Sequence, residues 1–371
     1  MLSLLGLKMN GIVAYCRPGF ESDCAAELQD KTAALGIYGY CQTKAQQGYV
    51  VYRCQNEEAE HLAKKLVLKE LIFTRQFFAV LAHVTDFPQT DRVSAVQVAL
   101  LDETVQEAFT GIKPCGDLRV ETPDTNDGKE LSKFCRKFTV PLRQGLRQID
   151  WLTTKESDRR PTLHAFFLSN QEVMIGFSYS FNQSPWLMGI PRLRSPSEAP
   201  SRSTLKLDEA FQVFVPEHER EVRISSGMNA VDLGAAPGGW TYQLVRRGMM
   251  VQAVDNGPMA ESLMETGQVK HIREDGFKYR PKKKNVTWLV CDMVEKPARV
   301  GELMTSWLVE GDCQEAIFNL KLPMKRRYAA VAEYLEHIKQ NLIEHGRGRF
   351  ELQAKQLYHD REEITVHIRW M

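Results

Sequence analysis

The sequence predicts an α/β protein, with a mainly parallel sheet in its C-terminal half and smaller α+β units before it. From Ser203 onward, short apolar runs alternate with helical patterns, which is typical of strand–helix–strand units in a parallel sheet. Within that half, residues 229–255 form a strand, a glycine-rich turn, a helix and a second strand ending at Asp255. Before it, residues 11–83 follow a β-α-β-β-α-β order, which favours a ferredoxin-like unit.

Composition is that of a soluble globular protein with two or three domains, since 43% of 371 residues are apolar and 26% are charged. Lys and Arg total 48 against 47 Asp and Glu, so any surface for nucleic acid must be a local patch. The apolar run in the opening MLSLLGLK is too short for a signal peptide or a membrane span. We therefore expect no membrane association.

The eight cysteines contain no C-x-x-C pair and have no histidines at ligand spacing. This pattern argues against a zinc site and favours reduced thiols. We expect a cytoplasmic protein without a bound metal.

The first unit is expected over residues 1–85. Its predicted strands lie at Ile12–Tyr15, around Tyr38, at Tyr49–Arg53 and at Phe77–His83, and its helices at Gly19–Leu35 and Glu57–Leu71. Nothing in this unit indicates catalysis.

The second unit is expected over residues 86–180, with a helix at 92–109, a strand at 118–121, a helix from Glu130 and a hairpin at 162–177. We expect the second helix to break at Pro141. Its basic residues recur at helical spacing and predict one cationic face, a plausible track for RNA phosphates; the candidates are Lys129, Lys133, Arg136 and Lys137, with Arg143 and Arg147 beyond the break. The alternative is an ordinary solvated helix face. Phe134 and Phe138 are expected to point into the core.

Residues 181–202 are rich in Ser, Pro and Arg and lack periodicity, which indicates a connection between domains. Arg192 and Arg194 in this segment are further candidates for RNA contact. The third unit, residues 203–371, carries the alternating pattern. Its predicted strands are Ala230–Leu233, Met250–Val254, Thr287–Cys291, Ala316–Leu320, Phe350–Gln356 and Ile364–His367, and its helices Thr204–Phe214, Gly239–Arg247, Pro297–Glu310 and Met324–His345.

The glycine-rich turn predicts a nucleoside-containing cofactor. A strand, a loop of small residues and a helix N-terminus offer backbone N–H groups, and an acid such as Asp255 at the tip of the second strand accepts ribose hydroxyls. A dinucleotide loop requires G-x-G-x-x-G, but this turn, residues 234–239, reads GAAPGG and lacks the middle glycine. S-adenosylmethionine, which has a nucleoside but no pyrophosphate, fits better. The alternative is a tight turn without a ligand.

Charged residues lie at the ends of the predicted strands or in the loops after them, at the edge where ligands bind in open α/β sheets. They are Asp232, Asp255, Asp275, Asp292 and Lys321. Lys321 is the most informative, because a lysine that closes an apolar strand must reach solvent or be held by carboxylates. A second ammonium group, from Lys206, would lower its pKa and make it a general base, with Glu363 orienting it. A structural salt-bridge cluster is the alternative.

These motifs resemble the Lys-Asp-Lys-Glu tetrad of FtsJ-type ribose 2′-O-methyltransferases, in the segments SRSTLK, VDLGAAPGG, CDM, NLK and EEITV. From about Gly11 to its end, the chain also resembles the ribosomal large-subunit RNA methyltransferase M family, in stretches such as FCRKFTVPLR, GFSYS, MGIPRL, VDNGPMA, DMVEKPA and IFNLKLPMK. The resemblance implies a ferredoxin-like part, a THUMP RNA-binding domain and a Rossmann-like class I methyltransferase domain.

The loop and the resemblance together define the candidate sites. The catalytic candidates are Lys206, Asp292, Lys321 and Glu363, with Lys321 as proton acceptor. The candidates for binding S-adenosylmethionine are Ser203, Asp232, Gly234, Ala236, Pro237, Gly238, Gly239, Trp240, Asp255, Asp275 and Asp292.

The activity implied is methylation of a cytidine 2′-hydroxyl in 23S ribosomal RNA, before or during assembly of the large subunit, by a monomeric enzyme. A non-catalytic RNA-binding assembly factor, an RNA base methyltransferase and a nicotinamide dehydrogenase are the competing interpretations. Cytosine C5 methylation needs a nucleophilic cysteine, and Cys291 is the candidate. It lacks the expected Pro-Cys setting, so we interpret it as a buried thiol.

Overall fold

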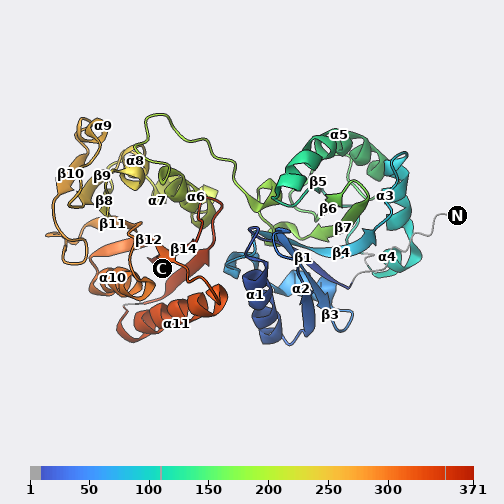
Figure 1. Ribbon diagram of the computed structural model, residues 1–371, viewed down its shortest axis with the longest axis horizontal. Helices are drawn as coiled ribbons and strands as arrows, with labels where there is room; N and C mark the ends of the chain where they lie inside the picture. The colour runs from blue at the N-terminus through green and yellow to red at the C-terminus, as the bar shows by residue number, and fades with distance from the viewer. Residues whose placement is uncertain (1–9, 109–110, 347) are drawn as a thin grey trace. The chain divides into compact units, whose positions relative to one another are not determined.

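The computed structural model describes residues 10–108, 111–346 and 348–371. The chain divides into two compact units, Met1–Ile190 and Pro191–Met371. Each unit has its own seven-stranded mixed sheet covered by helices (Figure 1). The finer boundaries at residues 85, 180 and 202 stay predictions.

The first half of unit 1 has the predicted β-α-β-β-α-β order. Its elements are β1 (Gly11–Tyr15), α1 (Glu21–Ala34), β2 (Gly39–Gln42), β3 (Tyr49–Cys54), α2 (Ala59–Lys65), the short helix η1 (Leu68–Glu70) and β4 (Gln76–Val84). The strands lie in the order β2-β3-β1-β4 and every neighbouring pair is antiparallel. This is the arrangement of a ferredoxin-like sheet.

The same sheet continues into the second half of unit 1, because β4 also pairs with β7. The added elements are α3 (Arg92–Leu101), α4 (Glu103–Ala108), β5 (Asp117–Glu121), α5 (Asn126–Gln148), β6 (Thr162–Ser169) and β7 (Glu172–Ser178). The full order is β2-β3-β1-β4-β7-β6-β5, and only the β5/β6 pair is parallel among these strands. The two predicted N-terminal units therefore share one sheet.

Two helix predictions in this unit were wrong. The helix expected at 92–109 is interrupted at Asp102 and divides into α3 and α4, and residue 109 lies outside the described part. The break expected at Pro141 does not occur, since α5 runs through it. Pro141 is exposed, so the carbonyl that loses its N–H partner can bind water.

The chain between β7 and Ile190 packs on unit 1 and includes two short helices, η2 (Ser180–Asn182) and η3 (Leu187–Gly189). The buried Asn182 amide donates to the backbone oxygens of Ala63 and Leu66, and its Oδ1 accepts from the Leu68 N–H. The first part of the predicted connection thus belongs to unit 1.

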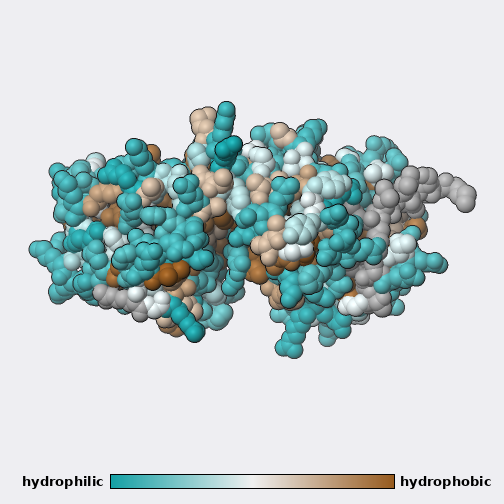
Figure 2. Space-filling view, turned by 90° about the horizontal axis from the view of Figure 1, so that it is seen from below, coloured by the Kyte–Doolittle hydropathy of each residue, from teal (hydrophilic) through white to brown (hydrophobic). Residues whose placement is uncertain are grey.

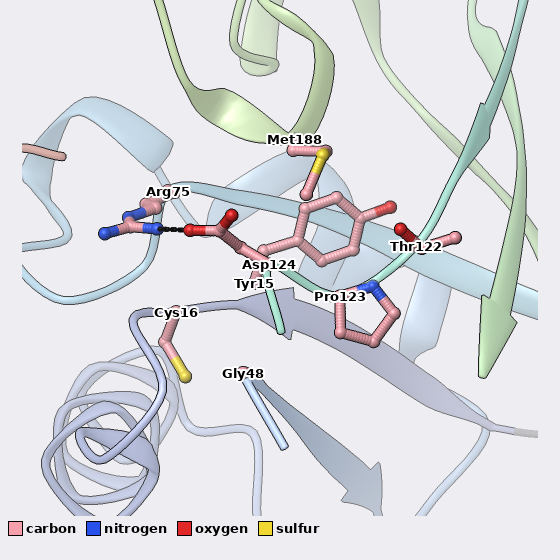
Figure 3. A pocket seen from close by; sticks show the side chains of 8 residues that line it. All are labelled: Tyr15, Cys16, Gly48, Arg75, Thr122, Pro123, Asp124 and Met188. Atoms are coloured by element: carbon pink, nitrogen blue, oxygen red, sulfur yellow. Dashed lines mark hydrogen bonds and ion pairs between the residues drawn. The ribbon is translucent and has the colours of Figure 1, made fainter. Parts of the chain in front are cut away.

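A small cavity lies beneath this segment, between Tyr15, Met188 and the Arg75–Asp124 ion pair (Figure 3). Its volume is about 10 Å³, room for one water molecule and not for a cofactor. The cofactor site must therefore be sought elsewhere.

Unit 2 has the strand order β10-β9-β8-β11-β12-β14-β13. Its strands are β8 (Asn229–Leu233), β9 (Met250–Val254), β10 (Val269–Ile272), β11 (Val286–Cys291), β12 (Cys313–Lys321), β13 (Phe350–Lys355) and β14 (Glu363–Trp370). The first five are parallel, while β14 is antiparallel to both of its neighbours. The prediction of a mainly parallel sheet holds, but β10 was not predicted.

Helices cover both faces of this sheet (Figure 1). They are α6 (Thr204–Phe214), η4 (Glu217–Glu219), α7 (Arg220–Arg223), α8 (Gly239–Val245), α9 (Glu261–Met264), α10 (Pro297–Glu310) and α11 (Arg327–His345). On one side α6 packs against α8, and on the other α10 packs against β12 and α11. The core between the sheet and α6 includes Phe211, Trp240 and Trp288.

The face seen in Figure 2 is dominated by hydrophilic residues, with hydrophobic areas between them. Over the part of the chain that the structure describes, no helix has the length and apolar character needed to cross a bilayer.

A buried carboxylate ties the parts of unit 1 together. Glu121, which is 3% exposed, accepts hydrogen bonds from Tyr15 Oη at 2.8 Å and from the Met188 N–H at 2.6 Å. Its Oε2 also lies 3.2 Å from His164 Nδ1. Glu121 thus joins β1, β5, β6 and the segment after β7.

We expect Glu121→Gln to lower the free energy of unfolding by about 2–3 kcal/mol, because an amide cannot accept all of these charge-assisted hydrogen bonds. Urea unfolding measures the change. The matched control is Glu172→Gln, which alters a partly exposed ion pair with His83 and should cost less than about 1 kcal/mol. Equal effects of the two substitutions would contradict the central role of Glu121.

Candidate functional site

Four charged side chains from four elements of unit 2 meet at the edge of its sheet. Lys206 Nζ on α6 lies 3.1 and 3.0 Å from the two carboxylate oxygens of Asp292, directly after β11, and 2.6 Å from Glu363 Oε1. Lys321 at the end of β12 donates to Glu363 Oε2, because the β12/β14 register pairs these two residues. The structure therefore brings all four catalytic candidates together.

Burial and mutual pairing act together on the pKa values of this cluster. Burial alone would lower the pKa of Lys206, but the carboxylates of Asp292 and Glu363 raise it above its ordinary value. For Glu363, burial acts to raise the pKa, and the two lysines outweigh it and hold the pKa below its ordinary value. Burial dominates at Asp292 and raises its pKa. Lys206 therefore remains a cation that holds both carboxylates.

An open cavity of about 580 Å³ adjoins the cluster, within the size range of cofactor pockets. The strand order reverses between β8 and β11, and ligands of open α/β sheets bind at such a point. Five predicted cofactor residues line the cavity: Gly234, Ala236, Asp255, Asp275 and Asp292.

The loop after β8 has the shape that the glycine pattern requires. Gly234 has a φ of +73°, and a Cβ there would lie 2.2 Å from Met293 Cγ. Asp255 fixes the loop, because its carboxylate accepts from the N–H groups of Ala236 at 3.0 Å and Gly257 at 2.7 Å. These contacts fix the position of the turn beside the cavity.

The other predicted cofactor residues do not line this cavity: they are Ser203, Asp232, Pro237, Gly238, Gly239 and Trp240. The Trp240 side chain is 2% exposed and packs in the hydrophobic core, so a side-chain contact with the cofactor is not supported. Asp232 is 1% exposed and accepts from Thr241 Oγ1 at 2.6 Å, which makes it a brace between β8 and α8.

The cavity wall also contains residues that the sequence did not single out. Phe277 carries the Arg299 guanidinium 4.4 Å above its ring, and Arg299 pairs with Glu295 at 2.6 Å. These residues come from a loop and from the start of α10. The sequence gives one sign that Phe277 lies in the cavity wall: it stands two residues after Asp275, a predicted cofactor residue.

The predicted RNA-binding residues of α5 differ in their surroundings. Lys129, Lys133, Arg136 and Lys137 are exposed along the helix. Arg143 instead pairs with Asp117 at 2.9 Å and Glu156 at 3.0 Å, so the structure favours a role within the fold. Phe138 is buried and packs with Phe134 and Phe167, which confirms that its ring faces the core. Phe134 is half-buried, and its ring contacts Phe167 and the Arg92 guanidinium.

The two arginines of the predicted connection lie in unit 2 and are exposed. Arg192 stacks on the Tyr358 ring at 5.2 Å. The stacking therefore fixes the position of the Arg192 guanidinium at the surface of unit 2.

Cys291 is fully buried, and burial raises the pKa of its thiol to about 12. A thiol in this state is a poor nucleophile, so the prediction of a buried thiol is confirmed. Among the described residues, no group of His, Cys, Asp and Glu is placed to hold a metal ion.

Comparisons with known protein families match three segments of the chain. Residues 9–78 match the RlmM ferredoxin-like domain, residues 91–179 the N-terminal region of ribosomal RNA large subunit methyltransferase M, and residues 199–321 the FtsJ-like methyltransferase family. Ribosomal RNA large subunit methyltransferase M of Idiomarina loihiensis is 66% identical over 371 residues, covering 100% of this chain and 99% of the relative. Its counterpart from Aeromonas hydrophila is 58% identical over 361 residues, covering 97% and 96%.

The sheet order, the glycine turn and the FtsJ-like match define a class I methyltransferase that uses S-adenosylmethionine. The identity to full-length relatives goes further. The chain belongs to the ribosomal RNA large subunit methyltransferase M family, which confirms the predicted family and the α/β fold class.

The buried Asp232 gives a test through pH. Burial raises the pKa of Asp232 from 3.8 to about 7, so the protonated form stabilises the fold. This stabilisation is complete below about pH 4 and is lost progressively as the pH rises to about 7. Asp232→Asn stays neutral throughout. Over this range, we expect the free energy of unfolding to fall more in the wild type than in the variant, by on the order of 4 kcal/mol.

Urea unfolding of the cofactor-free protein at intervals across this pH range measures the difference between the two proteins. Parallel curves for the wild type and Asp232→Asn would show that folding does not raise the pKa of Asp232.

Proposed function

We propose that this protein transfers a methyl group from S-adenosylmethionine to a ribose 2′-hydroxyl of a cytidine in 23S ribosomal RNA. The observation that carries the proposal is the four-residue charge cluster beside the cofactor cavity of an FtsJ-like domain. The relatives' name, ribosomal RNA large subunit methyltransferase M, supports the substrate class. Such a substrate would place the enzyme in the cytoplasm.

The cavity residues fit the cofactor. Asp255 lies at the end of β9, where an acid can accept ribose hydroxyls, and Gly234 gives the turn that lines the cavity its positive φ. When bound, S-adenosylmethionine supplies an activated methyl group on a sulfonium.

In this proposal Lys321 accepts the proton of the ribose hydroxyl. Its side chain is 30% exposed, so it can reach a substrate, whereas Glu363 is 5% exposed and fixes the lysine from the protein side. Lys206 remains an ammonium group and holds Asp292 and Glu363 in place. Alignment of the reacting atoms supplies most of the rate, and general-base help contributes about 10²- to 10⁴-fold.

The competing activities fit less well. A non-catalytic assembly factor does not require two lysines and two carboxylates to be paired beside a cavity. Cytosine C5 chemistry would need a reactive thiol, and the Cys291 thiol is buried with a raised pKa.

Removal of the proposed base is the direct test. We expect Lys321→Ala to lower kcat for methylation of 23S RNA lacking the modification by at least about 10²-fold, and to leave affinity for S-adenosylmethionine within about twofold. Mass spectrometry of ribose-methylated nucleotides and calorimetric titration of the cofactor measure the two effects.

The matched control is Lys339→Ala, which removes an exposed lysine from α11 in the same unit. It should leave kcat unchanged. A fully active Lys321→Ala enzyme would refute the assignment, and modification at a base instead of a ribose would refute the proposed reaction.

The exposed cations of α5 provide a separate test of RNA binding. We expect Lys133→Glu combined with Lys137→Glu to weaken binding of 23S RNA and to reduce the slope of log affinity against log salt by about 2, because two phosphate contacts are lost. Filter binding at several salt concentrations measures the slope. A matched pair on the α2–η1 surface, Lys65→Glu with Lys69→Glu, should have a smaller effect; equal losses would indicate only a general charge effect.

A further inference from the structure

A second group, besides Lys206, holds the Asp292 carboxylate. Asn319 donates its Nδ2 amide to Asp292 Oδ1 at 2.9 Å. Asn319 is 1% exposed and lies on β12 two residues before Lys321, so both side chains are on the same face of the strand. The amide nitrogen must face Asp292, because an amide oxygen would be repelled by the carboxylate.

The hydrogen bonds continue from Asn319 into the protein. Thr365 Oγ1 lies 2.8 Å from Asn319 Oδ1, and the β12/β14 register pairs these two residues directly. The same hydroxyl lies 2.9 Å from Asp360 Oδ2. Thr365 and Asp360 are both 0% exposed, so this series of hydrogen bonds ends at residues that solvent does not reach.

The number of hydrogen atoms shared by Asn319, Thr365 and Asp360 determines which groups donate and which accept in this series of hydrogen bonds. The Thr365 hydroxyl has one hydrogen, but both of its neighbours are oxygen atoms. If the hydroxyl donates to Asn319 Oδ1, Asp360 must itself carry a proton and donate it to Thr365. If Asp360 were ionised it would take the Thr365 hydrogen, and Asn319 Oδ1 would lose its donor.

The surroundings of Asp360 favour the protonated form. Its Oδ2 accepts from the Leu357 N–H at 3.0 Å, and its buried Oδ1 has no hydrogen-bond partner among the described residues. Burial raises the pKa of Asp360 well above its ordinary value, and the nearby carboxylates of Glu363 and Glu209 raise it further. His359 on the same loop pairs with Glu209, and Arg361 is exposed.

We propose that Asn319 is a positioning residue for methyl transfer: held by Thr365 and a protonated Asp360, it fixes the plane of the Asp292 carboxylate against Lys206 and the cofactor cavity. Its effect on catalysis rests on the proposed function. Lys206 reaches Asp292 through a long side chain, whereas the Asn319 amide is placed directly by the strand. Asp292 is therefore held from two directions.

Thr365→Val and Thr365→Ser form a matched pair, because valine keeps the shape of threonine without the hydroxyl and serine keeps the hydroxyl. We expect Thr365→Val to lower kcat about tenfold, with KM for S-adenosylmethionine within about twofold, and Thr365→Ser to restore most of the wild-type rate. Rates are compared per folded enzyme, with thermal unfolding measured for each variant. A role in stability alone would lower Tm in Thr365→Val and leave kcat unchanged, and that result would overturn the proposal.

The protonated Asp360 is tested without any activity assay. The infrared difference spectrum of wild type minus Asp360→Asn at neutral pH should contain the C=O band of a protonated carboxyl group. A carboxylate band in its place would overturn the proposal. If the wild type fails to methylate ribosomal RNA, the proposed function is refuted, while the infrared result still decides the state of the network.

Discussion

Two carboxylates and two lysines pair at the edge of the second sheet, and the placement of four elements depends on their pairing. Glu363 is 5% exposed and bridges Lys206 and Lys321. A buried charge that loses its partner is costly, so each of these residues constrains the others. A slip of one residue between β12 and β14 would turn Glu363 to the opposite face of the sheet and leave both lysines without it.

A second buried carboxylate holds the elements that carry this cluster. Glu209 on α6 accepts from the N–H groups of Tyr358 and His359, in the loop between β13 and β14. Lys206 stands one turn before Glu209 on the same helix, and Glu363 begins the strand that follows the loop. The helix that supplies one end of the charge cluster is therefore fixed to the loop that supplies the other, so the cluster can keep its geometry without contact with a ligand.

The local sequence pattern was sufficient to predict most helices and strands. It failed where tertiary contacts determine whether a segment forms a strand and how that strand pairs. The apolar runs of β8, β9, β11 and β12 predicted buried parallel strands. The strand β10, with the sequence VKHI, has only one buried residue and no apolar run, so its pairing with β9 was not visible. The direction of β14 was also not encoded locally, since an apolar strand reads alike in both directions. Its antiparallel pairing with β12 depends on the whole sheet.

The residues of the candidate site could be predicted from the sequence where they stand at the ends of strands. Lys321 and Asp292 stand directly at the ends of apolar runs, so their meeting follows from a parallel sheet. Asn319 and Thr365 instead lie inside strands, where a polar residue in an apolar run gives no sign of its partner. Their contact requires the register of β12 and β14, which is the same register that joins Lys321 to Glu363. One strand pairing therefore sets both the proposed base and the support of Asp292, and a change in that pairing would disturb the two together.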